Sequence, residues 1–353
     1  MEITKISVPG YEEVVRAVDQ SIDFHAIIAI HDTTLGPALG GCRLWNYATE
    51  DEALQDVLRL AKGMTYKAAC AGLALGGGKS VIIGNKRDEA IFLAMGEFVE
   101  SLGGRYITAE DVGTSVEDMK IIAQKTKYVT GLPREMGSSG DPSPFTAKGV
   151  FEGMKACLEE VYGNHDFQGK VVALQGVGHV GSYLAGHLHE AGAKLVICDM
   201  DSKKVEEVAN KYNAQVVELD KIYDADCHIF APCALGAVIN DETIPRLKCK
   251  IVAGPANNQL LRPEHAKKLQ ERGILYAPDY VLNAGGLINV YTELEPGGYD
   301  EKRAMERVNH IYDAIKNIIQ LAKKEGICTE EASERFAHSI LEKAKAEKQK
   351  SQS

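Results

Sequence analysis

Apolar and polar positions along the chain follow two periods, and each period predicts a different element. In residues 51–64, Leu54, Val57, Leu58 and Ala61 recur at the spacing of a helix with one buried face. Short unbroken apolar runs predict buried strands instead. Strands are predicted at 25–33, 80–84, 105–111, 170–176, 194–199, 214–217, 227–232, 250–254 and 274–281. Helices are predicted at 51–64, 90–103, 146–163, 178–192, 202–212, 300–326 and 330–346.

The order of these elements predicts an α/β fold with two domains. After residue 169, strands and helices alternate regularly, which is typical of a parallel sheet covered on both faces. The run GSSGDPSP at 137–144 is a Gly/Ser/Pro cluster that marks a loop. We therefore place the boundary between the domains at residues 138 and 139.

Composition and charge narrow the function classes. The 353 residues are 45% hydrophobic and 25% charged, a globular mixture, and the net charge of −10 argues against a nucleic-acid partner. No apolar run approaches the ~18 residues of a membrane span, and the N-terminus lacks a signal-peptide pattern. The eight cysteines form no CxxC pair, so we expect reduced thiols in a cytoplasmic protein and no metal site.

The stretch LALGGGKSVIIG at 73–84 places a lysine behind three glycines. A phosphate-binding P-loop would need a glycine where Leu73 stands and a helix after Lys79. The residues from Ser80 onward predict a strand instead. Lys79 therefore requires a different explanation from phosphate binding.

A second glycine-rich stretch has the context of a dinucleotide-binding turn. It lies between a predicted strand and a predicted helix, and the following strand ends in an acid. The residues assigned to the dinucleotide are Gly176, Gly178, His179, Val180, Gly181 and Asp199. A carboxylate at Asp199 would accept hydrogen bonds from ribose hydroxyls and repel a 2′-phosphate, which favours NAD, although Lys203 and Lys204 leave NADP open. The alternative is a structural turn that binds nothing.

The first domain supplies polar groups in apolar, glycine-rich surroundings: Lys67, Lys79 and Asp111. Each has a simpler interpretation, because a lysine is usually solvated and Asp111 could cap a helix that starts at Val112 or Gly113. Two neighbouring lysines disfavour each other's charged forms, and desolvation acts in the same direction. One could then hold a carboxylate while the other acts as an acid or base.

Taken together, these motifs resemble the Glu/Leu/Phe/Val amino acid dehydrogenase family. The resemblance covers nearly the whole chain and is carried by AIIAIHDTTLGPALGG, LRLAKGMTYKAA, GGGKSVIIG, GRYITAEDVGT, GSSGDPSP, VALQGVGHVG, FAPCALGA, VAGPANNQL and YAPDYVLNAGGLINV. It implies a substrate and oligomerisation domain at 1–138 and a doubly wound Rossmann-type NAD domain at 139–328. It also implies a C-terminal helix at 329–353 that returns to the first domain. Members are homo-oligomers, commonly octamers in the leucine-active branch.

The resemblance also implies roles for matching residues. Lys79 matches the catalytic lysine, Lys67 the lysine that binds the substrate carboxylate, and Asp111 the acid that moves protons at the amino group. Residues that border the cofactor in relatives match Thr146, Cys233, Ala234 and Asn257. Residues that line the substrate site match Leu39, Gly40, Gly41, Ala109, Asn283, Leu287 and Val290.

The resemblance implies NAD-dependent, reversible oxidative deamination of an apolar L-amino acid. Glutamate-specific relatives carry lysine where this chain has Leu39 and serine where it has Val290. Burying a glutamate carboxylate against aliphatic residues would cost several kcal/mol, so glutamate is not expected. Ala109 favours leucine and other branched aliphatic substrates, whereas Leu287 matches phenylalanine-active relatives, so phenylalanine or tryptophan is an alternative. A protein of another class, an NAD-binding sensor without catalysis, is a further alternative.

Overall fold

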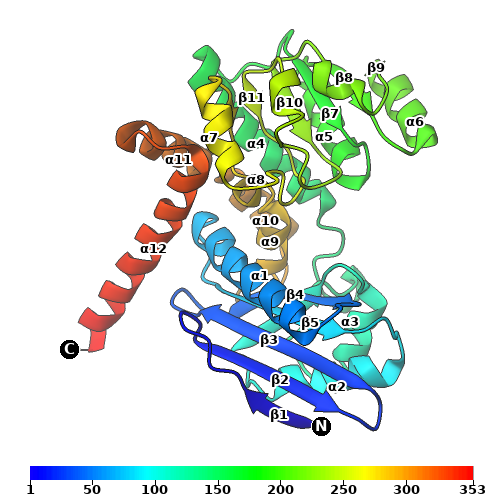
Figure 1. Cartoon of the computed structure of the whole chain (residues 1–353), viewed down its shortest axis with the longest axis vertical. Helices are drawn as coiled ribbons and strands as arrows, with labels where there is room; N and C mark the ends of the chain where they lie inside the picture. Colours follow the sequence, from blue (N-terminus) through cyan, green and yellow to red (C-terminus); the bar gives the residue numbers. More distant parts are fainter. Residues whose placement is uncertain (353) are drawn as a thin grey trace. The chain divides into compact units, whose positions relative to one another are not determined.

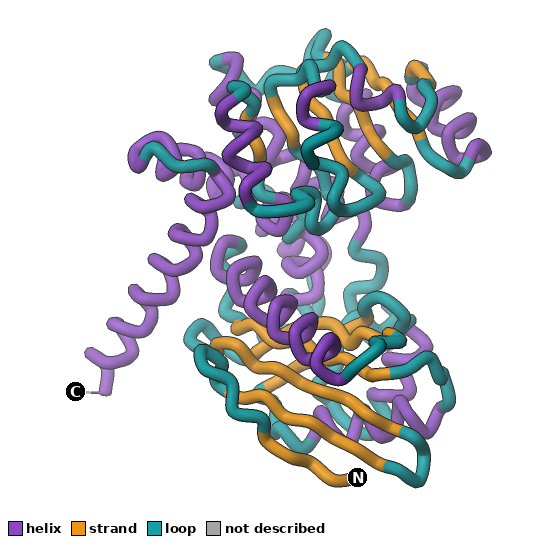
Figure 2. Tube along the Cα trace, viewed as in Figure 1, coloured by secondary structure: helices purple, strands orange, loops and turns teal. Residues whose placement is uncertain are grey.

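The computed structural model describes residues 1–352, which form two compact units (Figures 1 and 2). The first unit contains Met1–Asp141, Val290–Asp300 and the chain from Ala337 onward, and the second contains Pro142–Asn289 and Glu301–Phe336. The segment Val290–Asp300 thus belongs to the first unit, although the predicted boundaries assign it to the second domain. The domain boundaries at 138/139 and 328/329 remain predictions. In residues 1–352, no helix has both the length and the apolar character that crossing a bilayer requires.

The first unit is built on a mixed six-stranded sheet in the order β1-β2-β3-β5-β4-β6. Its strands are β1 (Glu2–Lys5), β2 (Glu13–Asp19), β3 (Phe24–Asp32), β4 (Ala38–Trp45), β5 (Gly76–Ile83) and β6 (Tyr106–Glu110). The strands β4, β5 and β6 run parallel to one another, whereas β1, β2, β3 and β5 pair antiparallel. The predicted strands 25–33, 80–84 and 105–111 are therefore present.

Helices cover both faces of this sheet. They are α1 (Glu50–Cys70), α2 (Glu89–Glu100) and α3 (Val116–Ile122), followed by the short η1 (Arg134–Met136). On one face, Val57 and Ala61 of α1 pack against Ile27 and Val81. The opposite face packs against α2 and α3 and contains the fully buried Tyr106. The apolar spacing of residues 51–64 therefore identified the buried face of α1 correctly.

The second unit contains a fully parallel sheet in the order β12-β11-β10-β7-β8-β9, the doubly wound arrangement of dinucleotide-binding folds. Its strands are β7 (Val171–Gln175), β8 (Lys194–Cys198), β9 (Gln215–Val216), β10 (Ile229–Pro232), β11 (Ile251–Val252) and β12 (Leu275–Tyr276). Its helical elements are α4 (Ser143–Tyr162), α5 (His179–Glu190), α6 (Ser202–Tyr212), η2 (Lys221–Asp224), η3 (Ile244–Arg246), α7 (Glu264–Glu271), α8 (Asp279–Leu282), α10 (Glu301–Val308) and α11 (Ile311–Glu325). Two further helices, α9 (Gly285–Tyr291) and α12 (Thr329–Gln352), begin in this unit and end in the first. The prediction of a Rossmann-type domain is confirmed.

The structure differs from the sequence prediction in several elements. The strands β1, β2 and β4 and the helix α3 were not predicted, and the helix predicted at 300–326 is divided into α10 and α11. The strand predicted at 274–281 ends at Tyr276, because Pro278 precedes the short helix α8. Among the C-terminal helices, α10 and α11 pack on α4 in the second unit. The last part of α12 belongs to the first unit, where the ring Nε2 of His338 lies 2.7 Å from Tyr66 Oη and Lys345 Nζ lies 3.5 Å from Asp32 Oδ2.

The contact between α1 and β5 leads to a stability prediction. A Cβ atom at Gly77 would lie 2.1 Å from the backbone nitrogen of Thr65, so Gly77→Ala would force the helix away from the strand. We expect a loss of about 1–3 kcal/mol in the free energy of unfolding. Gly63→Ala, inside α1 with no atom within 4 Å of the added Cβ, is the control and should gain about 0.5–1 kcal/mol. Denaturant unfolding measures both, and equal stability of the two variants would contradict the prediction.

Candidate active site

The register of β4, β5 and β6 brings several predicted site residues to one face of the first sheet. Leu39 pairs with Gly77 and Gly41 with Ala109. Because side chains alternate between the faces of a strand, residues two apart along each strand share a face. Lys79 therefore lies on the face that α1 covers, level with Gly41 and Ala109.

Lys79 forms a buried ion pair with Asp111, which lies one step further along that face. The Lys79 Nζ atom is 3.1 Å from Asp111 Oδ2, and Lys79 is only 5% exposed. Burial lowers the pKa of Lys79 because it disfavours the charged ammonium, while the Asp111 carboxylate partly opposes this shift. The pair thus combines a lysine prone to lose its proton with a carboxylate positioned to exchange one.

Arg43 is a member of this site that the sequence analysis missed. Its Nε atom lies 2.9 Å from Asp111 Oδ2, and its Nη1 atom lies 2.8 Å from Asp56 Oδ2. Burial by itself would raise the pKa of Asp111, but the positive charges of Lys79 and Arg43 outweigh burial and hold it below its usual value. The available signal was the strand period, because Arg43 follows Leu39 and Gly41 at steps of two.

The loop after β6 fixes the position of Asp111. The backbone N–H of Asp111 donates to Thr114 Oγ1 at 2.9 Å, and the Thr114 hydroxyl donates to the carbonyl of Cys42 at 2.8 Å. Gly113 has a φ of 82°, and a Cβ there would lie 2.0 Å from the carbonyl oxygen of Leu44. The alternative role of Asp111 as a helix cap is wrong, because Ser115 caps α3.

Close packing explains the glycines around Lys79. Gly77 admits the backbone of α1, and Gly78 admits the ring of Tyr106, which would lie 2.8 Å from an added Cβ. The Tyr106 hydroxyl donates to the carbonyl of Gly40 at 2.6 Å. A Cβ at Gly41 would lie 2.7 Å from the Cβ of Asp111, so Gly41 leaves room for that side chain. These glycines therefore position the two charged groups by allowing their strands and helix to approach.

Lys67 lies in the last turn of α1 and is half-buried. The same helix packs on β5, the strand that carries Lys79. The predicted lysine pair therefore comes from two elements in direct contact.

In the second unit, the three glycines of the turn have three different surroundings. Gly176 has a φ of 109°, and a Cβ there would lie 2.7 Å from the Cβ of Ala234. At Gly181 a Cβ would lie 2.3 Å from the Gly176 carbonyl oxygen, so α5 packs closely on the end of β7. At Gly178, in contrast, an added Cβ would meet nothing within 4 Å. The turn is therefore open at Gly178 and closely packed at the other two glycines.

The start of α5 suits an anionic ligand. Within residues 1–352, no side chain caps its N-terminus at Gly178, so the N–H groups of the first turn remain available for phosphate oxygens. His179 is exposed there and Val180 is half-buried. Asp199 directly follows β8, and its Oδ2 atom accepts from the N–H of Val177 in the turn at 2.7 Å. The open turn and the uncapped helix start fit the pyrophosphate of a dinucleotide.

Other predicted cofactor residues form small groups within this unit. Cys233 and Ala234 follow β10 and contact the glycine turn. Asn257 accepts at Oδ1 from Nδ2 of Asn283, a residue predicted to line the substrate site, at 2.6 Å. Thr146 lies in the first turn of α4, where its hydroxyl donates to the carbonyl of Pro142 at 3.1 Å.

The four residues predicted to contact the substrate side chain divide between the units. Leu39 is buried, and Ala109 is half-buried on the same face of the first sheet. Val290 belongs to the first unit, whereas Leu287, only 8% exposed, belongs to the second. Each unit thus contributes part of the predicted specificity set.

Comparison with known families matches both units. The profile described as Glu/Leu/Phe/Val dehydrogenase, dimerisation domain, matches residues 11–128. The profile described as Glutamate/Leucine/Phenylalanine/Valine dehydrogenase matches residues 137–204 and 197–348. Together they cover most of the chain, including the buried lysine–aspartate pair and the glycine turn.

Individual relatives differ in their named substrates. The chain is 56% identical to leucine dehydrogenase of Thermoactinomyces intermedius, over 94% of this chain and 91% of the relative. It is 47% identical to phenylalanine dehydrogenase of the same organism, over 95% of this chain and 92% of the relative. The crystal structure of L-tryptophan dehydrogenase from Nostoc punctiforme is similar with a TM-score of 0.88 at 47% identity, covering 96% of this chain and 97% of that one.

The glycine turn provides a prediction that separates folding from ligand binding. Gly181→Ala should lower the free energy of unfolding by about 1–3 kcal/mol, because its Cβ would collide with backbone. Gly178→Ala should leave stability nearly unchanged, since its Cβ enters open space at an ordinary φ of −66°. It should nevertheless weaken NAD binding, measured by calorimetry. Unchanged NAD affinity in Gly178→Ala would contradict the assignment of this turn to the pyrophosphate.

Proposed function

Because this chain belongs to the Glu/Leu/Phe/Val dehydrogenase family, we propose that it catalyses the NAD-dependent, reversible oxidative deamination of a branched-chain L-amino acid, with leucine preferred. The products are the 2-oxo acid and ammonia. The observation that carries the proposal is the buried pair of Lys79 and Asp111 on the face of the first sheet. A catalytically silent sensor would have no need to keep a desolvated lysine in contact with a carboxylate.

In the proposed reaction, Lys67 binds the substrate carboxylate and Lys79 acts as the base. Hydride loss from the substrate Cα leaves an iminium group, which neutral Lys79 converts to a carbinolamine by deprotonating the attacking water. Asp111 transfers protons to the departing nitrogen, and collapse of the carbinolamine releases ammonia. The lowered pKa of Lys79 supports this role, because a base must be unprotonated at the working pH.

NAD, when bound, supplies the acceptor for the hydride. We assign its pyrophosphate to the turn at Gly176, Gly178 and Gly181, and its adenosine ribose to Asp199. The closely packed and open glycine positions support the first assignment. The second is supported by the Asp199 carboxylate, which is anchored to the turn by the Val177 N–H. We assign Thr146, His179, Val180, Cys233, Ala234 and Asn257 to the cofactor border.

The specificity proposal depends on the apolar set around the substrate side chain. Leu39 and Ala109 share the face of the sheet that carries Lys79, and neither side chain can neutralise a carboxylate. Leu287 and Val290 complete this set, while Gly40, Gly41 and Asn283 line the rest of the site. The higher identity to a leucine dehydrogenase than to the phenylalanine- and tryptophan-active relatives favours branched aliphatic substrates.

We further propose that the enzyme is a homo-oligomer, an octamer as in leucine-active relatives, and that it works in the cytoplasm. The match to a dimerisation domain supports self-association. The free thiols of all eight cysteines are compatible with a reducing compartment.

The test of this function is NAD reduction by the purified protein with leucine, isoleucine, valine, phenylalanine, tryptophan and glutamate. We expect the branched aliphatic substrates to give the highest kcat/KM and glutamate the lowest. The Lys79→Ala variant should lose turnover and keep its NAD affinity, whereas Lys62→Ala, an exposed lysine of α1, is the control. Wild-type turnover in Lys79→Ala would reject Lys79 as the base. A higher kcat/KM for phenylalanine or tryptophan than for leucine would overturn the leucine preference.

Arg43 leads to a prediction about the pH profile. Its positive charge lowers the pKa of both Asp111 and Lys79, so Arg43→Gln should raise both values. The pH dependence of kcat/KM should therefore move toward alkaline pH. Arg59→Gln is the matched control, because Arg59 contacts Asp56 at the far end of the same network and is more exposed. If the pH dependence of kcat/KM is the same in Arg43→Gln as in the wild type, Arg43 does not set the protonation states of Asp111 and Lys79.

A further inference from the structure

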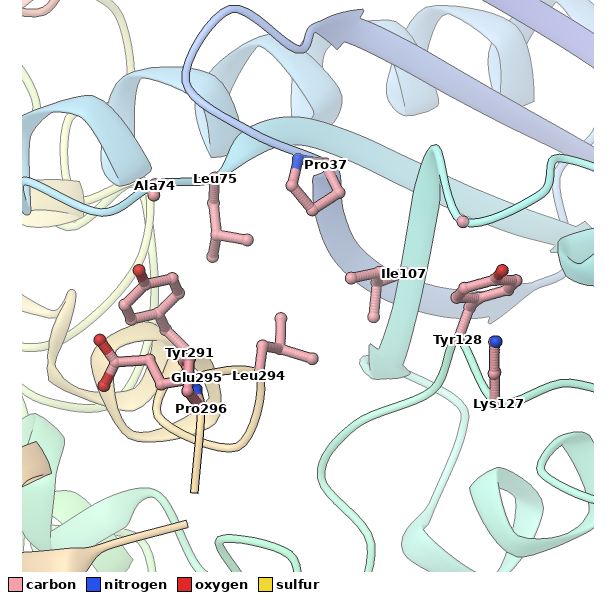
Figure 3. A pocket seen from close by; sticks show the side chains of 11 residues that line it. Pro37, Ala74, Leu75, Ile107, Lys127, Tyr128, Tyr291, Leu294, Glu295 and Pro296 are labelled. Carbon is pink, nitrogen blue, oxygen red and sulfur yellow. The ribbon is translucent and has the colours of Figure 1, made fainter. Parts of the chain in front are cut away.

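A pocket of about 510 Å³ opens in the first unit at the amino ends of β4, β5 and β6 (Figure 3). Its apolar lining includes Pro37, Leu75, Ile107, Tyr291, Leu294 and Pro296. Figure 3 shows the side chains of Leu75, Ile107 and Leu294 pointing toward one another. The pocket is much larger than the terminal methyl groups of a leucine side chain.

The sheet register relates this pocket to the proposed active site. Ile107 pairs with Leu39, and both lie one two-residue step before the level of Lys79 and Ala109 on the same face. Because a strand rises about 3.3 Å per residue, one step is roughly 6.6 Å. Leu75 lies a second step beyond, at the far side of the pocket.

The direction of the substrate follows from this order. In the proposed function the reacting Cα lies at Lys79, and Leu39 contacts the substrate side chain. From the level of Lys79, Leu39 and Ile107 lie one step back along the strands, and Leu75 lies two steps back. A leucine side chain is shorter than one step, so it ends near Leu39 and leaves the pocket beyond unfilled.

We propose that this pocket is a distal extension of the substrate site that receives the ends of long, straight apolar side chains. The proposal rests on the proposed function, and it names unbranched 2-amino acids longer than leucine as further substrates. Ile107 borders the entrance and Leu75 the far wall. The lining also contains one charge of each sign, on Glu295 and Lys127.

The experiment compares kcat/KM across L-norvaline, L-norleucine, L-2-aminoheptanoate and L-2-aminooctanoate, with leucine as the reference. The wild type should keep kcat/KM for 2-aminoheptanoate within about tenfold of the value for leucine, because each added methylene gains apolar contact. Ile107→Trp should lower kcat/KM for the two longest substrates at least tenfold relative to leucine, since it fills the entrance.

Leu294→Trp is a second variant, because Leu294 is 39% exposed and its enlargement carries little risk to folding. It should lower the same ratio. Leu261→Trp, at a leucine that is 49% exposed in the other unit, is the matched control and should leave the ratio unchanged.

The outcomes separate the two proposals. Two outcomes would overturn the distal pocket while the dehydrogenase function stands. One is activity on leucine together with a sharp fall in the wild-type kcat/KM for straight-chain substrates longer than norvaline. The other is an unchanged ratio of long-chain to leucine kcat/KM in both pocket variants. Absence of turnover with every amino acid tested would reject the proposed function and the pocket with it.

Discussion

The buried contact between Lys79 and Asp111 is the constraint on which the first unit depends. Removing both charges from water is costly, and only a short, well-placed contact compensates for it. Gly41 leaves space for the aspartate, and the loop held by Thr114 fixes its backbone. Arg43 adds a second cation on the same carboxylate oxygen, which keeps Asp111 ionised while burial keeps Lys79 inclined to lose its proton.

Glycines allow close packing or an unusual backbone conformation in both units, for a different physical reason at each position. At Gly77 and Gly181 the absence of a side chain permits backbone to approach backbone, so these positions set the spacing of helix and strand. At Gly176 the turn requires a positive φ. Gly178 is different, because no protein atom would collide with a side chain there. Packing within the protein therefore does not require a glycine at this position, whereas a bound ligand would.

In the proposed function, the order of residues along one sheet face links catalysis with specificity. Asp111, Lys79, Leu39 and Leu75 follow one another from the charged end of the face to the apolar pocket. Because the parallel strands are in register, each step of two residues in sequence places the next side chain on that face further along a bound substrate. Small changes at the apolar end can therefore alter the preferred side chain without disturbing the charged groups, which agrees with a family whose named members act on different amino acids.

The sequence by itself determined the helices and strands with clear periods, the doubly wound second unit and the family, because these depend on local patterns and on motifs in a fixed order. It also indicated Lys79 and Asp111 as candidate catalytic residues. Only the tertiary structure decided that Arg43 binds Asp111, that Ser115 rather than Asp111 caps α3, and that the strand at 274–281 ends early at Tyr276. The pairing of Ile107 with Leu39 likewise depends on strand register, which joins residues distant in sequence and leaves no local periodic signal.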